Sequence, residues 1–227
     1  MIGVLCFVLK PSSVWPHAKV LFSTAELLET LQHGPGLALL LWLLHLSRRW
    51  AECSFLHVWS DATMHVVVLA FGLLHYIGAN ASLLLAAEGA CADTMQHGTV
   101  TSDLMYVAGF LLVVLGQGGQ HWAHRQLAAL RRPPPPQHTH KHTPARSVGK
   151  YHLPSGGMFA LSSSPHYTCE VCIYAGLALL CGGSAPMLLL LAWSATNLAL
   201  SAVATQAWYK AKFDETPSAW AIFPGIL

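Results

Sequence analysis

Three long apolar runs constrain the fold of this chain most strongly: residues 64–86, residues 104–119 with their flanks, and residues 185–204. A helix needs about 20 mostly apolar residues to cross the hydrocarbon core of a bilayer. Two shorter apolar runs, at residues 36–46 and 171–180, reach that length only when their flanks are included. The pattern predicts an all-α, multi-span membrane bundle of about five to six transmembrane helices, the sixth being a segment before Gly34.

The composition agrees with a membrane-embedded chain. Charged residues make up 10% of the sequence and hydrophobic residues 54%. A soluble domain is usually about 25% charged, so this chain has too few charges to cover a water-facing surface. Its net charge of +2 is also too small to indicate a nucleic-acid partner.

The basic residues orient the predicted helices. Ten of the twelve Lys and Arg residues follow the first, third and fifth apolar runs, which places them on one side of the membrane: Arg48, Arg49, Arg125, Arg131, Arg132, Lys141, Arg146, Lys150, Lys210 and Lys212. The loops on the opposite side contain no Lys or Arg. The positive-inside rule therefore predicts that the basic side is cytosolic.

The longest loop, after the third run, is rich in Pro and His. Four prolines follow Arg132, and His138, His140 and His142 alternate with other residues. A polyproline stretch cannot be helical, so we expect a solvated cytosolic loop and no metal site. In domain terms, residues 1–35 form an N-terminal segment, for which a truncated span is one interpretation, and residues 36–227 form one membrane domain.

Glu170 is the first candidate functional residue, because it is a lone carboxylate at the start of the apolar run 171–180. A charge inside the membrane costs several kcal/mol unless a partner or a proton compensates it. His166 lies four residues earlier and could pair with it, and Tyr167 adds a further hydrogen-bonding group. Helix capping accounts for the serines at 162–164 almost as well as a site does, but it does not account for Glu170.

Two further polar clusters lie on the predicted cytosolic side. Gln120, His124 and Arg131 share one helix face, and the forked guanidinium of Arg131 is suited to a phosphate; a snorkelling helix at the membrane edge is the alternative. The other cluster recurs at every fourth position of the last apolar run and comprises Asn197, Ser201, Thr205 and Tyr209. Hydrogen bonding between helices explains that stripe equally well.

Together these clusters resemble the C-terminal reductase domain of the steroid 5-alpha-reductase family, and within it the polyprenol reductase branch. The family pattern Y-x-x-P-x-G-x-x-F followed by S-x-P-x-Y-x-x-E is matched by Tyr151, Pro154, Gly156, Phe159, Ser163, Pro165, Tyr167 and Glu170. The branch adds an arginine pair, E-C and M-H, matched by Arg48, Arg49, Glu52, Cys53, Met64 and His65. Its last span is matched by residues 197–202 and 208–213, so the resemblance covers about residues 36–224.

The resemblance implies a multi-pass enzyme of the endoplasmic reticulum membrane that uses NADPH, bound on the cytosolic side, to saturate a carbon–carbon double bond. In this branch the substrate is a long-chain isoprenoid lipid, the bond lies in its alpha-isoprene unit, and the product is the dolichol skeleton used in protein N-glycosylation. The cofactor pocket implied by position comprises Gln120, His124, Arg131, Tyr151, His166, Tyr167, Glu170, Asn197, Ser201 and Tyr209.

The chemistry of the reduction narrows the substrate. Hydride adds to a carbon that is conjugated with a carbonyl group, and an allylic alcohol lacks that activation, so we expect the aldehyde polyprenal to be the species reduced. An acid must then polarise the carbonyl oxygen, where charge develops in the transition state. Glu52 and His65, at the cytosolic mouth, are the predicted catalytic acids.

Other functions remain open from sequence alone. Within the same chemistry, the acceptor could be a 3-oxo-steroid or an enoyl thioester. A methyltransferase of the isoprenylcysteine type also combines membrane spans with cytosolic polar loops. A non-catalytic membrane paralogue is the alternative outside the enzymes.

Overall fold

The computed structural model describes residues 34–59, 63–93, 100–132, 147–148 and 151–226. Its five long helices are α3 (Gly34–Ala51), α4 (Val66–Asp93), α5 (Val100–Arg131), α6 (Pro165–Leu180) and α7 (Ala185–Phe213). A π-helical turn, η1 (Glu52–Leu56), continues α3, and a 3₁₀ turn, η2 (Gly157–Ala160), precedes α6. The strands β1 (Ser147–Val148) and β2 (Tyr151–His152) form a short antiparallel pair. The all-α prediction is confirmed, and each of the five apolar runs lies in its own helix, except that residues 64 and 65 precede α4.

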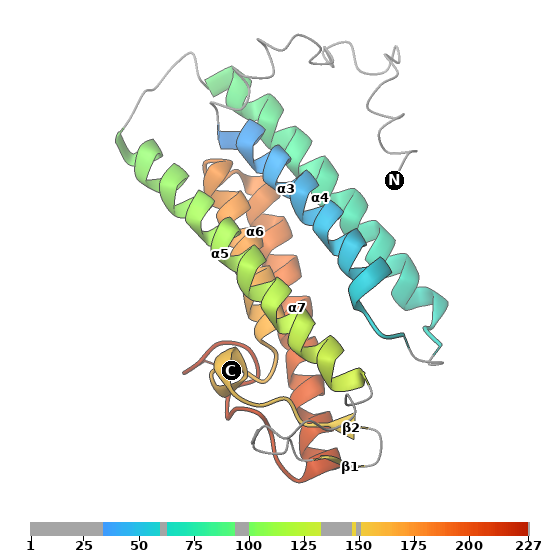
Figure 1. Cartoon of the computed structure of the whole chain (residues 1–227). Helices are drawn as coiled ribbons and strands as arrows, with labels where there is room; N and C mark the ends of the chain where they lie inside the picture. Colours follow the sequence, from blue (N-terminus) through green and yellow to red (C-terminus); the bar gives the residue numbers. More distant parts are fainter. Residues whose placement is uncertain (1–33, 60–62, 94–99, 133–146, 149–150, 227) are drawn as a thin grey trace.

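The long helices run alternately up and down the bundle (Figure 1), so the C-terminal ends of α3, α5 and α7 lie toward its lower end. The basic residues that end these helices therefore gather on one side, as the alternation predicted. The predicted N-terminal segment before Gly34 and the histidine run at 138–142 lie outside the described residues.

Two helices of the described chain are long and apolar enough to cross a membrane: residues Val66–Ala87 of α4 and Ala185–Phe213 of α7. Only 11% of the α4 window and 22% of the α7 window is buried, whereas the core helix of a soluble protein would be mostly covered. Large apolar side chains such as Leu189, 72% exposed, therefore face outward. An uncovered apolar surface of this extent suits contact with lipid. The expectation of five to six spans stays a prediction.

Glycines bring α5 and α6 into close contact. A Cβ atom added at Gly176 would lie 2.6 Å from the Gly109 carbonyl oxygen, and one added at Gly116 would lie 2.9 Å from the Cys169 carbonyl oxygen. No side chain fits between the backbones at these points, so the two helices approach as closely as their main chains allow. This seam places the polar end of α5 directly against Glu170.

The serine triplet before α6 holds the C-terminal segment. The Ser163 backbone N–H donates to the Trp220 carbonyl at 2.8 Å, and the Ser162 hydroxyl donates to the Ala221 carbonyl at 3.1 Å. The Ser163 hydroxyl donates to the Ser218 carbonyl at 3.0 Å. The serines therefore fasten the end of the chain across the start of α6, and none of them caps that helix through its side chain.

Candidate functional site

A buried carboxylate, Glu52, lies where α3 passes into η1, and four basic side chains surround it. Glu52 is 3% exposed. Arg48 and Arg49, one turn earlier, donate to its two oxygens at 2.5 and 2.6 Å. The Nδ1 atoms of His121 and His124, from α5, each lie 2.7 Å from a Glu52 oxygen. The arginine contacts are local, because Arg48 and Arg49 precede Glu52 by four and three residues. The histidine contacts instead depend on the packing of α5 against α3 and η1.

This environment keeps Glu52 ionised. Burial alone would raise its pKa, but hydrogen bonds from His124, His121 and Arg49, together with the charge of Arg48, hold the pKa of Glu52 well below its ordinary value. An ionised carboxylate is suited to hold the two arginines and the two histidines, and the role of Glu52 as an acid stays a prediction. His65, the other predicted acid, is exposed at the start of α4, where its Nδ1 accepts the Val67 backbone N–H at 3.3 Å.

Glu170 is bound by residues from two other helices. The Gln120 side-chain amide donates to it from α5, and His45 Nε2 of α3 lies 3.4 Å from its other oxygen. The predicted pairing with His166 is therefore replaced by these two contacts. Arg48 completes the network, because its guanidinium also donates to the Gln120 side-chain carbonyl. The two carboxylates thus belong to one network across α3, α5 and α6.

Three histidine rings meet beside this network. The His124 ring centroid lies 5.5 Å from that of His57 and 5.7 Å from that of His166. His57 Nε2 and His166 Nδ1 are buried and have no hydrogen-bond partner in the described structure. Burial, reinforced by the charges of His124 and Arg49, lowers the pKa of His57. Buried polar atoms without partners are rare in folded proteins, so these two nitrogens are candidate ligand contacts.

A small pocket opens at the same place. It is lined by His57, Val58, His124, Leu127, Ala128 and Arg131. The Arg131 guanidinium donates to the Val58 carbonyl at 3.1 Å, which holds this cation at the rim. Among the described residues no group of three or more His, Cys, Asp or Glu side chains is arranged to bind a metal ion. An anionic or amide-bearing ligand suits the pocket better.

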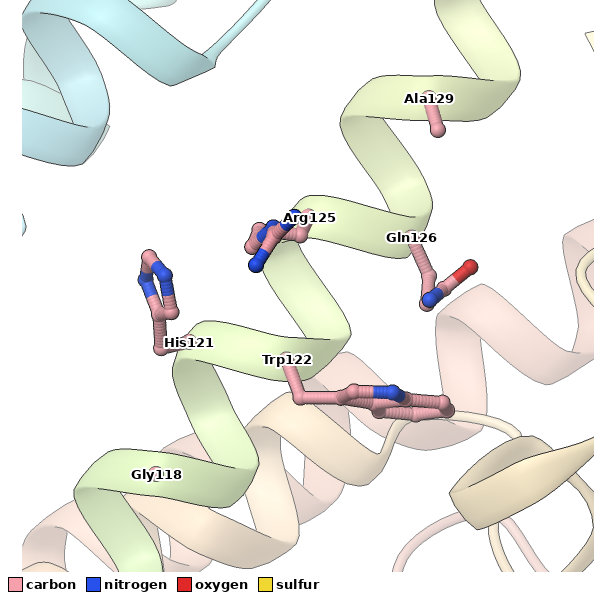
Figure 2. Close-up of a pocket in the computed structure, with 6 residues that line it drawn as sticks. All are labelled: Gly118, His121, Trp122, Arg125, Gln126 and Ala129. Atoms are coloured by element: carbon pink, nitrogen blue, oxygen red, sulfur yellow. The ribbon is translucent and has the colours of Figure 1, made fainter.

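A second hollow, of about 320 Å³, lies along the outer face of α5. Figure 2 shows the residues that line it, which are Gly118, His121, Trp122, Arg125, Gln126 and Ala129. In this view the His121 and Trp122 side chains leave the helix in different directions. His121 thus both lines this hollow and contacts Glu52.

The remaining predicted cofactor residues lie nearer α7. Tyr167 shares a hydrogen bond with Thr205, and Tyr209 is buried with Leu153 and Phe213. The Tyr151 ring meets the Trp208 ring edge to face at 5.5 Å. Two residues do not join either group: Asn197 is exposed, and the Ser201 hydroxyl donates to the Asn197 carbonyl within its own helix at 2.9 Å.

Sequence reasoning missed three members of the site, His45, His57 and His121. Helical spacing and adjacency in the sequence indicate two of these residues, but only weakly. His45 precedes Arg48 by three residues and Glu52 by seven, which puts it on the same face of α3, and His121 adjoins Gln120. The arginine pair indicates topology and matches a family motif, and its i,i+3 and i,i+4 spacing to Glu52 also indicates a shared helix face.

Comparisons with known proteins agree with the resemblance. The domain family described as 3-oxo-5-alpha-steroid 4-dehydrogenase matches residues 62–227. The polyprenal reductase of Caenorhabditis elegans is 30% identical over 84% of this chain and 60% of its own length. That of Danio rerio is 31% identical over 80% of the chain and 56% of its own length. Polyprenal reductase 2 of Oryza sativa subsp. japonica is 30% identical over 83% and 58%. The chain thus spans 60% or less of the length of these relatives.

Proposed function

Because the chain belongs to the 3-oxo-5-alpha-steroid 4-dehydrogenase family, we propose that it is a membrane-bound reductase that saturates a carbon–carbon double bond conjugated with a carbonyl group. The proposed substrate is polyprenal, whose alpha-isoprene double bond would be reduced to give the dolichol skeleton for protein N-glycosylation. The observation that carries this proposal is the similarity to proteins named polyprenal reductase, which extends over 84% of the chain in one case.

The proposed cofactor is NADPH, which supplies the hydride. One observation supports the fit of such a group to the described residues. The unpartnered nitrogen of His57 belongs to the pocket that Arg131 also lines, and the ring of His166, which has an unpartnered nitrogen as well, lies 5.7 Å from that of His124 in the same pocket. We assign Arg131 to a phosphate of the nucleotide and the two imidazoles to its neighbouring polar atoms. Glu170, held in place by Gln120 and His45, would accept the amide hydrogen atoms of the nicotinamide.

The proposed location is the endoplasmic reticulum membrane, with five or six spans and the cofactor end in the cytosol. The basic residues at the C-terminal ends of α3, α5 and α7 lie on the same side of the bundle, which supports this orientation. Single cysteines in a cysteine-depleted chain test it. Cysteines at Ser54 and Gln126 should react with a membrane-impermeant maleimide from the cytosolic side, and one at Gly182 should react only after permeabilisation. The reverse pattern would contradict the orientation.

Assays with the full chain in detergent or vesicles test the activity. With NADPH we expect polyprenal to be reduced to the saturated aldehyde and polyprenol to be left unchanged unless an oxidant is added. Equal rates with the alcohol and the aldehyde would overturn the enal as substrate. The family description favours a second candidate, a 3-oxo steroid with a conjugated double bond, so the steroid serves as the competing substrate. Faster turnover of the steroid would replace polyprenal with that class.

A further inference from the structure

Tyr174 and His75 form a hydrogen-bonded pair on the apolar side of Glu170. His75 Nε2 lies 2.6 Å from the Tyr174 hydroxyl oxygen, and the two rings meet edge to face at 5.5 Å. Tyr174 is 1% exposed and follows Glu170 on α6 by four residues, which is one helical turn. His75 comes from α4, one of the two helices whose apolar surface is largely uncovered. The pair therefore lies between the polar network and the lipid-facing side.

An aromatic bridge connects this pair with the Glu170 site. Trp42 stacks on His45 at 5.3 Å with an interplanar angle of 12°, and its ring lies 5.7 Å from that of Tyr174. His45 in turn contacts Glu170, as Gln120 does. A continuous set of side chains thus runs from the proposed nicotinamide site to the Tyr174 hydroxyl, in the direction from which a membrane lipid would arrive.

The proposed reduction needs a proton donor, and the two residues predicted from sequence are poorly placed for it. Glu52 is ionised within its basic cluster, and His65 is exposed at the start of α4. We propose that Tyr174, assisted by His75, donates the proton to the carbonyl oxygen of the substrate enal. This inference rests on the proposed function, and it adds a catalytic residue that no sequence motif indicates.

The step balances with one hydride and one proton. The β-carbon of the enal accepts hydride from the reduced nicotinamide and forms a carbon–hydrogen bond, and the electrons of the former double bond move toward the carbonyl oxygen. The Tyr174 O–H bond breaks and its proton joins that oxygen, giving the enol. His75 Nε2–H then donates to the phenolate oxygen, and a proton from water restores the pair. Transfer of the enol proton to the α-carbon completes the saturated aldehyde.

The geometry suits this assignment, because the carbonyl oxygen of an enal is three bonds from the carbon that takes the hydride. When a nicotinamide is held beside Glu170, the carbonyl oxygen of the enal would lie near the next turn of α6, which carries Tyr174. The phenol there lies among buried apolar side chains such as Ile173 and Leu177. A neutral donor in dry surroundings interacts strongly with a developing oxyanion.

The substitution Tyr174→Phe tests the inference, with Tyr76→Phe as the matched control. Tyr76 adjoins His75 on α4, and its ring also approaches Trp42, at 6.4 Å. The first readout needs no turnover: the infrared carbonyl stretch of an isotope-labelled enal bound without cofactor. We expect a lowered stretching frequency in the unmodified chain and in Y76F, and a frequency near that of the unbonded aldehyde in Y174F.

The second readout is kinetic. We expect kcat with NADPH to fall about 100-fold or more in Y174F, as for loss of a general acid, with KM and NADPH affinity nearly unchanged. A Y174F enzyme that keeps a lowered carbonyl frequency, or more than a tenth of kcat, would overturn the inference. An unmodified chain that binds the enal with a lowered frequency but never reduces it would instead overturn the proposed function and leave the contact standing.

Should Y174F fail to fold, His75→Asn tests the same step, because Tyr174 is then retained while its imidazole partner becomes an amide. The bound enal should still show a lowered carbonyl frequency, and kcat should fall about tenfold. An unchanged kcat, or loss of the frequency shift, would overturn the assignment of the pair.

Discussion

The Arg48 guanidinium donates a hydrogen bond to the side-chain carbonyl of Gln120, and this contact joins the two interior carboxylates of the bundle. Arg48 also pairs with Glu52 at 2.5 Å, and the amide end of Gln120 donates to Glu170. α3, α5 and α6 are therefore held by one polar network, and a change at its centre affects both carboxylates.

Gln120→Leu should destabilise the chain. Leucine occupies a similar volume but leaves Glu170 and the Arg48 guanidinium, both partly buried, each without one partner. An unsatisfied buried group costs about 1–3 kcal/mol, and more when it is charged, so we expect a loss of about 3 kcal/mol. Thermal unfolding in detergent measures it. Gln126→Leu, on the exposed side of the same helix, is the control and should change stability by less than about 0.5 kcal/mol. Equal losses in both variants would contradict the network.

Gly176→Ala tests the close approach of α5 and α6. The new methyl group would lie 2.6 Å from the Gly109 carbonyl oxygen and 2.7 Å from a Val113 methyl carbon, so the helices must separate. Overpacking of this kind costs about 1–3 kcal/mol. Gly118→Ala adds the same methyl group to α5 where nothing lies within 4 Å, and the better helix propensity of alanine should raise stability by up to about 1 kcal/mol. Opposite signs in thermal unfolding are the expected result, and a stable G176A would show that the seam is not tight.

Sequence alone predicts the positions of the helices and singles out Glu170 as a candidate residue. Each apolar run became one helix, because helix formation satisfies the backbone hydrogen bonds that lipid cannot. Glu170 was singled out because a charge in an apolar run has a cost that some partner must offset. That much follows from local composition.

The partners of Glu170 could not be read from the sequence. The i,i+4 rule pointed to His166, whereas packing supplied Gln120 and His45 from other helices. The choice depends on which face of α5 meets α6, and glycines at positions 109, 116 and 176 determine that face through contacts distant in sequence. For the same reason the spacing of Asn197 and Ser201 predicted a shared face of α7 but not what that face contacts.

Acidification below pH 6.5 should destabilise the fold through His57. Burial is the main cause of its lowered pKa, and the charges of His124 and Arg49 add to it, while Glu52 opposes them. Below the ordinary histidine pKa the unfolded chain therefore binds more protons at this site than the folded chain does. The free energy of unfolding therefore decreases as the pH is lowered, by at most about 1.4 kcal/mol per pH unit from one residue.

His57→Asn should therefore flatten the dependence of melting temperature on pH between 7 and 5. Glu52 does not contribute there, because its pKa is lowered and its stabilisation is lost only in stronger acid. His152→Asn, which removes an exposed histidine of β2, is the control and should melt with the same pH dependence as the unmodified chain. Parallel curves for H57N and the unmodified chain would contradict the assignment.

Arg131→Ala should alter the choice between NADPH and NADH if Arg131 binds the phosphate that distinguishes them. A hydrogen-bonded charge pair contributes about 1.5–3 kcal/mol, so KM for NADPH should rise about tenfold or more, while KM for NADH should change little. The control is Arg125→Ala, because Arg125 lines the outer hollow of α5 rather than the histidine pocket. An equal rise in KM for both cofactors would mean that Arg131 acts through its bond to the Val58 carbonyl, which positions η1, and that the phosphate is held elsewhere.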